Sequence, residues 1–195
     1  MNRDLLKIGI EFHGHRCPAM PLGMRAGLAA LKKLDVDRAS NKELHHYCET
    51  GPSHTQTCFM DRIQLSTGCT FGKGNIEKLN YGKNAFIVDV KNKKAVRVSW
   101  NPDFQVKYQS SEFVNKRKKG VAPKDIKPEI VDPAIEKIAT MEDGEMLKVE
   151  EIKNFDFKPK KGTFDWERCA KGGVVFSTGL RVVNDKHYCI PWSEL

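Results

Sequence analysis

The sequence lacks any long hydrophobic run. Its longest apolar stretches, such as residues 85–88 and 172–176, are far shorter than the roughly 20 residues that a helix needs to cross a bilayer. The first residues also lack the uninterrupted apolar segment and the small-residue cleavage site of a secretory signal. We therefore expect a protein without membrane contact that lies in the cytoplasm.

Aromatic residues are also scarce, at 9% of the chain. The net charge of +8 would help to attract nucleic acid or other anions, but much of it is concentrated in residues 116–119 and 158–161. Few aromatic residues accompany these runs, and stacking of bases needs aromatic side chains. We therefore interpret the runs as solvated charges and expect no nucleic-acid partner. A nucleic-acid-binding or regulatory protein is the alternative.

The hydrophobic pattern predicts an α+β fold, with mixed helices and an antiparallel sheet as its core. Apolar residues at helical spacing predict helices over residues 4–12 and 21–34, which bracket the segment 13–20. Alternating apolar residues predict strands over residues 44–49, 84–90 and 95–100, with a turn at 91–94 that joins the last two into a hairpin.

We expect three parts along the chain. Residues 1–100 form the α+β core. Residues 101–165 are rich in lysine and proline and read as a connecting arm that packs on the core or on a partner. The arm contains two expected helices, at residues 133–141 and 144–152. Residues 166–195 form a small β module, with strands at 174–176 and 180–183 and a turn at 184–186.

The densest group of metal-ligating residue types is the segment His13-Gly14-His15-Arg16-Cys17-Pro18. In an extended segment, residues two apart project to the same face, so His13, His15 and Cys17 can converge on one ion, whereas a helix would separate them. Imidazole and thiolate together suit zinc or another borderline transition metal. Two hydrogen-bonded histidines and a buried thiol are the alternative.

Cys58 and the glycine-rich segment 68–75 form a second cluster. If Cys58 begins a helix, the helix dipole favours its thiolate, which makes it a fourth metal ligand or a reactive thiol. The glycine segment has one residue too few, and no Ser or Thr after its lysine, to be a nucleotide-triphosphate loop. A nest for a smaller anion or an organic cofactor remains open, beside a purely structural turn. Within this segment, Cys69 and Lys73 are the candidate catalytic residues, and Gly72 and Asn75 are the candidate cofactor-binding residues.

The C-terminal module has half the ligands of a zinc ribbon. Cys169 and Cys189 are present, but the other two ligand positions hold Gly172 and Trp192. This disfavours a structural zinc there. Cys169, Cys189 and His187 can in principle bind an ion with one further ligand, but two buried thiols or a single disulfide are the simpler interpretation.

Four segments resemble, in their order and spacing, the signature blocks of the FmdE family, which is named for the E component of formylmethanofuran dehydrogenase. They are FHGHRCP (12–18), CFMDRIQ (58–64), TGCTFGKGN (67–75) and YGKNAF (81–86). The resemblance covers about residues 4–100 and implies an α+β core, a homodimer, a metal near the first block and a C-terminal zinc ribbon. By position it implies His13, His15, Cys17 and Cys58 as metal ligands.

The sequence departs from the family pattern in three ways: an insertion-like stretch at 51–57, the large Arg62, and the two missing ribbon cysteines. The last departure predicts a ribbon fold without its ion, with Trp192 packed where zinc would lie. We expect a metal-binding accessory protein or small redox-related enzyme of anaerobic metabolism. One ion, with zinc favoured, would lie at the N-terminal cluster, open to a small-molecule ligand, and an oxidoreductase is a possible partner. A scaffold subunit of a molybdenum or tungsten enzyme complex is a further alternative.

Overall fold

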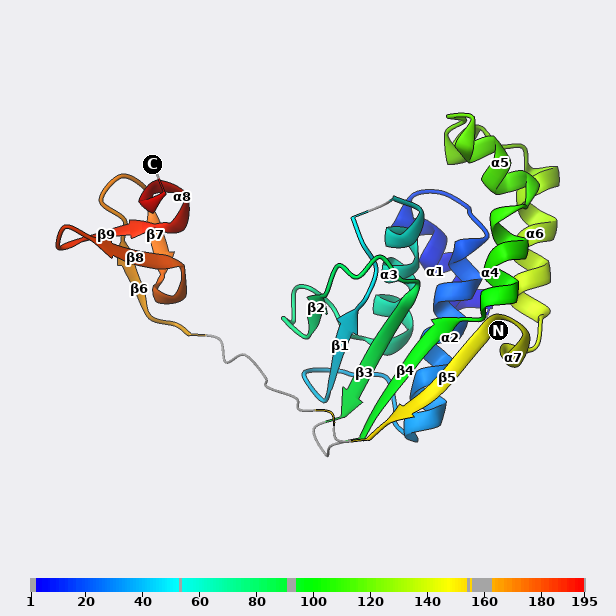
Figure 1. Ribbon diagram of the computed structural model, residues 1–195, viewed down its shortest axis with the longest axis horizontal. Helices are drawn as coiled ribbons and strands as arrows, with labels where there is room; N and C mark the ends of the chain where they lie inside the picture. The colour runs from blue at the N-terminus through cyan, green and yellow to red at the C-terminus, as the bar shows by residue number, and fades with distance from the viewer. Residues whose placement is uncertain (1–2, 53, 91–93, 154, 156–162, 195) are drawn as a thin grey trace. The chain divides into compact units, whose positions relative to one another are not determined.

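The computed structural model describes residues 3–52, 54–90, 94–153, 155 and 163–194. It divides the chain into two compact units, Met1–Phe157 and Lys158–Leu195 (Figure 1), and each is described by itself. The division differs from the expected boundaries at residues 100 and 165, because the segment after residue 100 belongs to the first unit. The expected turn at 91–93 and the basic run at 158–161 lie outside the described residues.

The first unit contains one five-stranded sheet, whose strands are β1 (Leu44–Cys48), β2 (Ile76–Lys78), β3 (Ala85–Val90), β4 (Lys94–Trp100) and β5 (Leu147–Ile152). They lie in the order β2-β1-β3-β4-β5. β2 runs parallel to β1, and the other neighbouring strands are antiparallel. β3 and β4 form the predicted hairpin pair, with Val88 opposite Val96. Together with the helices, this sheet confirms the α+β class.

The helices of the first unit are α1 (Arg3–His13), α2 (Ala19–Leu34), α3 (His54–Thr67), α4 (Pro102–Gln109), α5 (Glu112–Lys118), α6 (Pro128–Thr140) and α7 (Asp143–Met146), with a 3-10 turn at Pro123–Asp125. Helices α1, α2 and α3 lie together on one side of the sheet in Figure 1, and α2 packs against both α3 and β4. None of the helices in the described ranges is long and apolar enough to cross a bilayer.

The contact between α2 and α3 depends on glycine. A Cβ atom placed on Gly23 would lie 2.7 Å from the Phe59 carbonyl oxygen, and one on Gly27 would overlap the Ser66 side chain. The two helix backbones therefore approach more closely than any larger residue allows. Next to them, Leu22, Phe59 and other side chains fill the core between the helices and the sheet.

The segment expected to be a connecting arm completes the core. Phe104 of α4, Ile138 of α6 and Met146 of α7 are buried in the main hydrophobic cluster. The helix expected at 144–152 is wrong, because only α7 is helical and residues 147–152 form β5 along β4. Helix α6 begins at residue 128 rather than 133, because Pro128 occupies the first helical turn, where proline is favoured.

The second unit consists of two hairpins and a short helix. Its strands are β6 (Trp166–Arg168), β7 (Val174–Phe176), β8 (Leu180–Val183) and β9 (Lys186–Cys189), followed by α8 (Ile190–Ser193), with a 3-10 turn at Ser177–Gly179. β6 pairs with β7, and β8 pairs with β9. Asn184 and Asp185 both adopt positive φ, 49° and 59°, as a two-residue hairpin turn of this kind requires.

Candidate metal centre

The first block of the sequence forms a helix end and a loop, not the extended segment that we expected. His13 is the last residue of α1, and Gly14 follows with a φ of +86°, in the left-handed region that favours glycine. The amide of Gly14 donates a hydrogen bond to the Ile10 carbonyl, which ends the helix. The chain then passes through His15 and Cys17 and enters α2.

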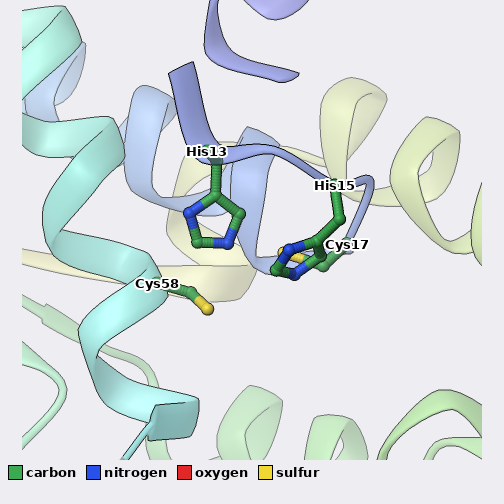
Figure 2. A group of neighbouring side chains, drawn as sticks. All are labelled: His13, His15, Cys17 and Cys58. Atoms are coloured by element: carbon green, nitrogen blue, oxygen red, sulfur yellow. The ribbon is translucent and has the colours of Figure 1, made fainter. Parts of the chain in front are cut away.

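The loop brings its three candidate ligands to the side of α3 that carries Cys58. One ligand atom from each of His13, His15, Cys17 and Cys58 lies within 4.8 Å of the others (Figure 2). The two cysteines are buried, at 3% and 7% exposure. Because Cys58 lies 41 residues after Cys17 in the sequence, the close packing of α3 against α1 and α2 is what completes the group.

Asp61 orients the His13 ring. Its Oδ2 atom lies 2.6 Å from Nδ1 of His13. This hydrogen bond, followed by the nearby sulfur of Cys58, raises the pKa of His13 from 6.5 to about 9. A carboxylate on Nδ1 leaves Nε2 to face the cluster, which is the arrangement that supports metal-bound histidines.

The two sulfurs share one hydrogen bond. The Cys58 thiol lowers the pKa of Cys17, and the backbone amides of Ala19 and Met20 at the start of α2 lower it further against the opposing effect of burial. Cys17 and burial raise the pKa of Cys58 well above its usual range. The structure therefore favours the thiolate on Cys17, at the positive end of α2.

These four residues fit a transition-metal ion. The Nε2 atoms of His13 and His15 are buried and have no hydrogen-bond partner among the described residues. Buried polar atoms normally have partners, and a shared ion would pair both nitrogens at once. A tetrahedral site with nitrogen ligands at about 2.0 Å and sulfur ligands at about 2.3 Å would need only a contraction of this group. Two imidazoles and two thiols match the preferences of zinc.

The other predicted site residues lie elsewhere. Cys69 is fully buried in the main core, while Cys17 and Cys58 belong to a separate cluster of buried residues. Lys73 donates through Nζ to the carbonyls of Ala39 and Ser40.

The remaining two predicted residues also belong to this loop. Asn75 accepts a hydrogen bond from the Thr70 amide and donates to the carbonyls of Asn41 and Leu44. Gly72 lies in the turn, with open space around its Cα. The geometry favours a structural turn here, and the catalytic and cofactor-binding roles of these residues stay predictions.

The structure adds residues that the sequence patterns did not single out. Asp61 lies one helical turn after Cys58, a spacing from which its contact with the cluster can be inferred. Arg62, which the sequence marks only as unusually large, is fully buried beside the cluster and donates to the Gly9 carbonyl. A pocket next to the cluster is lined by Trp100 and by Arg117 of α5. No spacing in the sequence links these residues to the first block.

The C-terminal unit keeps the arrangement of a ribbon site without its full set of ligands. The Cys189 amide donates to the sulfur of Cys169 at 3.2 Å. A Cβ atom on Gly172 would lie 3.4 Å from that sulfur and 3.6 Å from the Trp192 ring. The indole therefore packs beside the position of a missing ligand. Among the described residues, a group of three or more potential ligands occurs at the N-terminal cluster and not here.

The comparisons with known proteins agree with this geometry. The sequence matches the family model described as "FmdE, Molybdenum formylmethanofuran dehydrogenase operon" over residues 12–148. The chain therefore belongs to the FmdE family. The match extends through the segment that we expected to be an arm, in agreement with its place in the core.

Two individual proteins are similar to this chain. A crystal structure of an FmdE-like protein of tungsten formylmethanofuran dehydrogenase, from Syntrophus aciditrophicus, superimposes with a TM-score of 0.61 at 21% identity, covering 98% of this chain and 91% of that one. This likeness shows the fold alone. A probable S-adenosyl-L-methionine-binding protein of Archaeoglobus fulgidus is 38% identical over 103 residues, which cover 52% of this chain and 28% of that protein.

Proposed function

We propose that this FmdE-family protein binds one transition-metal ion, with zinc as the best match, through Nε2 of His13 and His15 and the sulfurs of Cys17 and Cys58. The observation that carries the proposal is the convergence of these four ligand atoms within 4.8 Å, with both Nε2 atoms buried and unpaired among the described residues. The Asp61 carboxylate supports it by fixing the His13 ring.

The ion would be reachable by a small molecule. His15, Cys17 and Cys58 line the adjoining pocket, so a ligand in the pocket would approach the ion from this side. When bound, the ion would supply a Lewis acid that polarises an oxygen of the ligand. The protein's own residues would shape the pocket and hold the ligand in place.

The family supports a role beside a larger enzyme. Its description refers to the molybdenum formylmethanofuran dehydrogenase operon, and we propose a cytoplasmic, homodimeric accessory protein or small redox-related enzyme that works with an oxidoreductase. A scaffold subunit of that enzyme complex is the second candidate. Stable co-purification of untagged protein with a molybdenum or tungsten enzyme at a fixed ratio supports the scaffold role, and purification without it favours the accessory role.

Elemental analysis tests the metal centre. Untagged protein is purified without oxygen, and each metal is measured as moles per chain for wild type, Cys17→Ser and Cys69→Ser. Cys69 is the matched control, because it is also a buried cysteine but lies outside the cluster. We expect about one equivalent in wild type and Cys69→Ser and its loss in Cys17→Ser. Metal retained by a folded Cys17→Ser protein overturns the assignment.

A further inference from the structure

The candidate metal centre adjoins a pocket with a volume of about 80 Å³. His15, Cys17 and Cys58 contribute to one wall, and the rest of the described lining includes Asn84, Trp100 and side chains of α4 and α5. A volume of this size accommodates a molecule of only a few non-hydrogen atoms, since a water molecule in the liquid takes up about 30 Å³. The chemistry of the lining then indicates which molecule fits.

Two residues of the lining carry buried polar atoms without partners. Trp100 is 4% exposed and Asn84 is 7% exposed. Neither Nε1 of Trp100 nor Oδ1 of Asn84 has a hydrogen-bond partner within the described part of the chain. An unpaired buried polar group costs about 1–3 kcal/mol. A ligand that offers one acceptor and one donor would satisfy both atoms.

The aromatic core fixes the Trp100 ring. It makes edge-on contacts with Phe59 and Tyr108, with ring centroids 5.7 Å and 5.3 Å apart. These contacts prevent the indole N–H from turning toward another partner. Trp100 therefore presents a preformed donor, which is the kind of fixed polar group that orients a ligand in a largely apolar pocket.

The charge of the pocket favours an anion. Arg117 lines it, and no aspartate or glutamate belongs to its described lining. Burial lowers the pKa of His15, and the positive charges of His13 and Arg117 lower it further, so the Arg117 guanidinium acts on the cluster. The Arg117 side chain is held by a hydrogen bond to the Val121 carbonyl. A carboxylate is the small anion whose oxygens match both a guanidinium and an indole N–H.

We infer that the pocket binds a small hydroxycarboxylate beside the ion. One carboxylate oxygen accepts from Trp100 Nε1 and faces Arg117, and the hydroxyl group donates to Oδ1 of Asn84. The inference rests on the proposed function for the ion at the pocket wall, but the three protein contacts do not depend on it. Glycolate is the smallest probe that carries both groups.

Nuclear magnetic resonance of the full-length, zinc-loaded protein tests the inference. The chain has three tryptophans, whose indole N–H signals are followed during titration with glycolate, and Trp100→Phe identifies the signal of Trp100. We expect glycolate to shift that signal saturably. Acetate lacks the hydroxyl and glycolamide lacks the charge, so both should bind at least about tenfold more weakly.

Two variants of α5 separate recognition from general charge. Arg117→Gln should raise the Kd for glycolate at least about tenfold and leave the zinc content unchanged. Lys116→Gln makes the same charge change at the preceding, exposed residue and should leave the Kd unchanged. Glycolate affinity that Arg117→Gln does not alter, or glycolamide that binds as tightly as glycolate, overturns the inference.

The zinc content, measured on the same samples, separates the two proposals. If zinc is present at one equivalent and glycolate does not move the Trp100 signal, the hydroxycarboxylate inference fails and the metal centre stands. If zinc does not bind, the metal proposal fails. The titration of the metal-free protein then still decides whether Trp100 and Arg117 recognise glycolate.

Discussion

Oδ2 of Asp61 lies 2.6 Å from Nδ1 of His13 and so determines which imidazole nitrogen faces the sulfurs of the cluster. The two residues lie on different helices, α1 and α3, and the contact joins these helices at the site. The partly exposed Asp61 makes this contact with little involvement in the core. Its role in metal binding can therefore be separated from its role in folding.

Replacement of Asp61 by asparagine should weaken zinc binding by roughly 10–100-fold without unfolding the protein, because the ring of His13 loses its charged partner. Competition with a chromophoric chelator measures the affinity. Asp132→Asn is the matched control, since Asp132 pairs with Arg16 of the same loop and is not one of the four candidate ligands. An Asp61→Asn protein that binds zinc as tightly as the control contradicts the orienting role.

The ion pair of Glu49 and Arg97 should contribute more to stability than the exposed ion pairs. Glu49 is buried and accepts two hydrogen bonds from Arg97, at 2.6 and 2.8 Å, and these raise the pKa of the arginine. Glu49→Ala leaves the guanidinium without its main partner, and we expect a loss of roughly 3 kcal/mol in the free energy of unfolding.

Chemical denaturation measures this loss. Lys148→Ala breaks the exposed pair of Lys148 and Glu150 on the neighbouring strand and should change the free energy of unfolding by less than about 1 kcal/mol. If the two variants are equally stable, the Glu49–Arg97 pair has no special weight. A Glu49→Leu/Arg97→Met double variant should recover most of the loss, because no buried charge remains unpaired.

Much of the first half of the fold can be predicted from the sequence because its elements are long and periodic. The helix at 4–12 and the hairpin strands at 84–90 and 95–100 lie close to where the pattern places them. The segment 101–157 could not be predicted in this way. Its helices are short, and their buried residues, such as Phe104 and Ile138, are separated by lysines and prolines that resemble a linker.

The candidate site shows the same limit. His13, His15 and Cys17 stand together in the sequence, so a metal-ligating loop can be inferred without a structure. The pocket beside them cannot, because Trp100 and Arg117 reach it only through the folding of a segment with no recognisable motif. Local spacing predicts the ligands, and tertiary packing determines what the ligands face.

Two glycines predict opposite responses to alanine. Gly23→Ala places a Cβ atom 2.7 Å from the Phe59 carbonyl oxygen, which lies in helix backbone that cannot yield easily. We expect a loss of about 1–3 kcal/mol in the free energy of unfolding, as for other overpacked cores. Gly72→Ala meets open space without a positive φ, and we expect a change within about 0.5 kcal/mol.

Thermal and chemical denaturation of both glycine variants checks this contrast. The Gly72→Ala protein also tests whether Gly72 takes part in a binding site. If it folds normally and retains both zinc and glycolate binding, the turn is structural. Equal stability of the two variants contradicts the close packing of α2 on α3.

His46 should make the protein less stable in acid. Its ring is completely buried against Phe86, neither nitrogen has a hydrogen-bond partner among the described residues, and burial lowers its pKa from 6.5 to about 3. Between these two values the unfolded chain binds a proton that the folded chain does not. The contribution of His46 is therefore complete above pH 6.5 and is lost as the pH falls, by up to about 1.4 kcal/mol per pH unit.

Denaturant unfolding at several pH values between about 4 and 7 measures this slope for wild type, His46→Leu and His187→Gln. The leucine variant cannot bind the proton, so its stability should fall less steeply with acid. The ligand histidines are unchanged in all three proteins, and their contribution cancels in the comparison. His187 is exposed on the C-terminal unit, so its variant should keep the wild-type slope. A leucine variant with the wild-type slope would show that His46 titrates normally in the folded protein, and its burial would then have to be reconsidered.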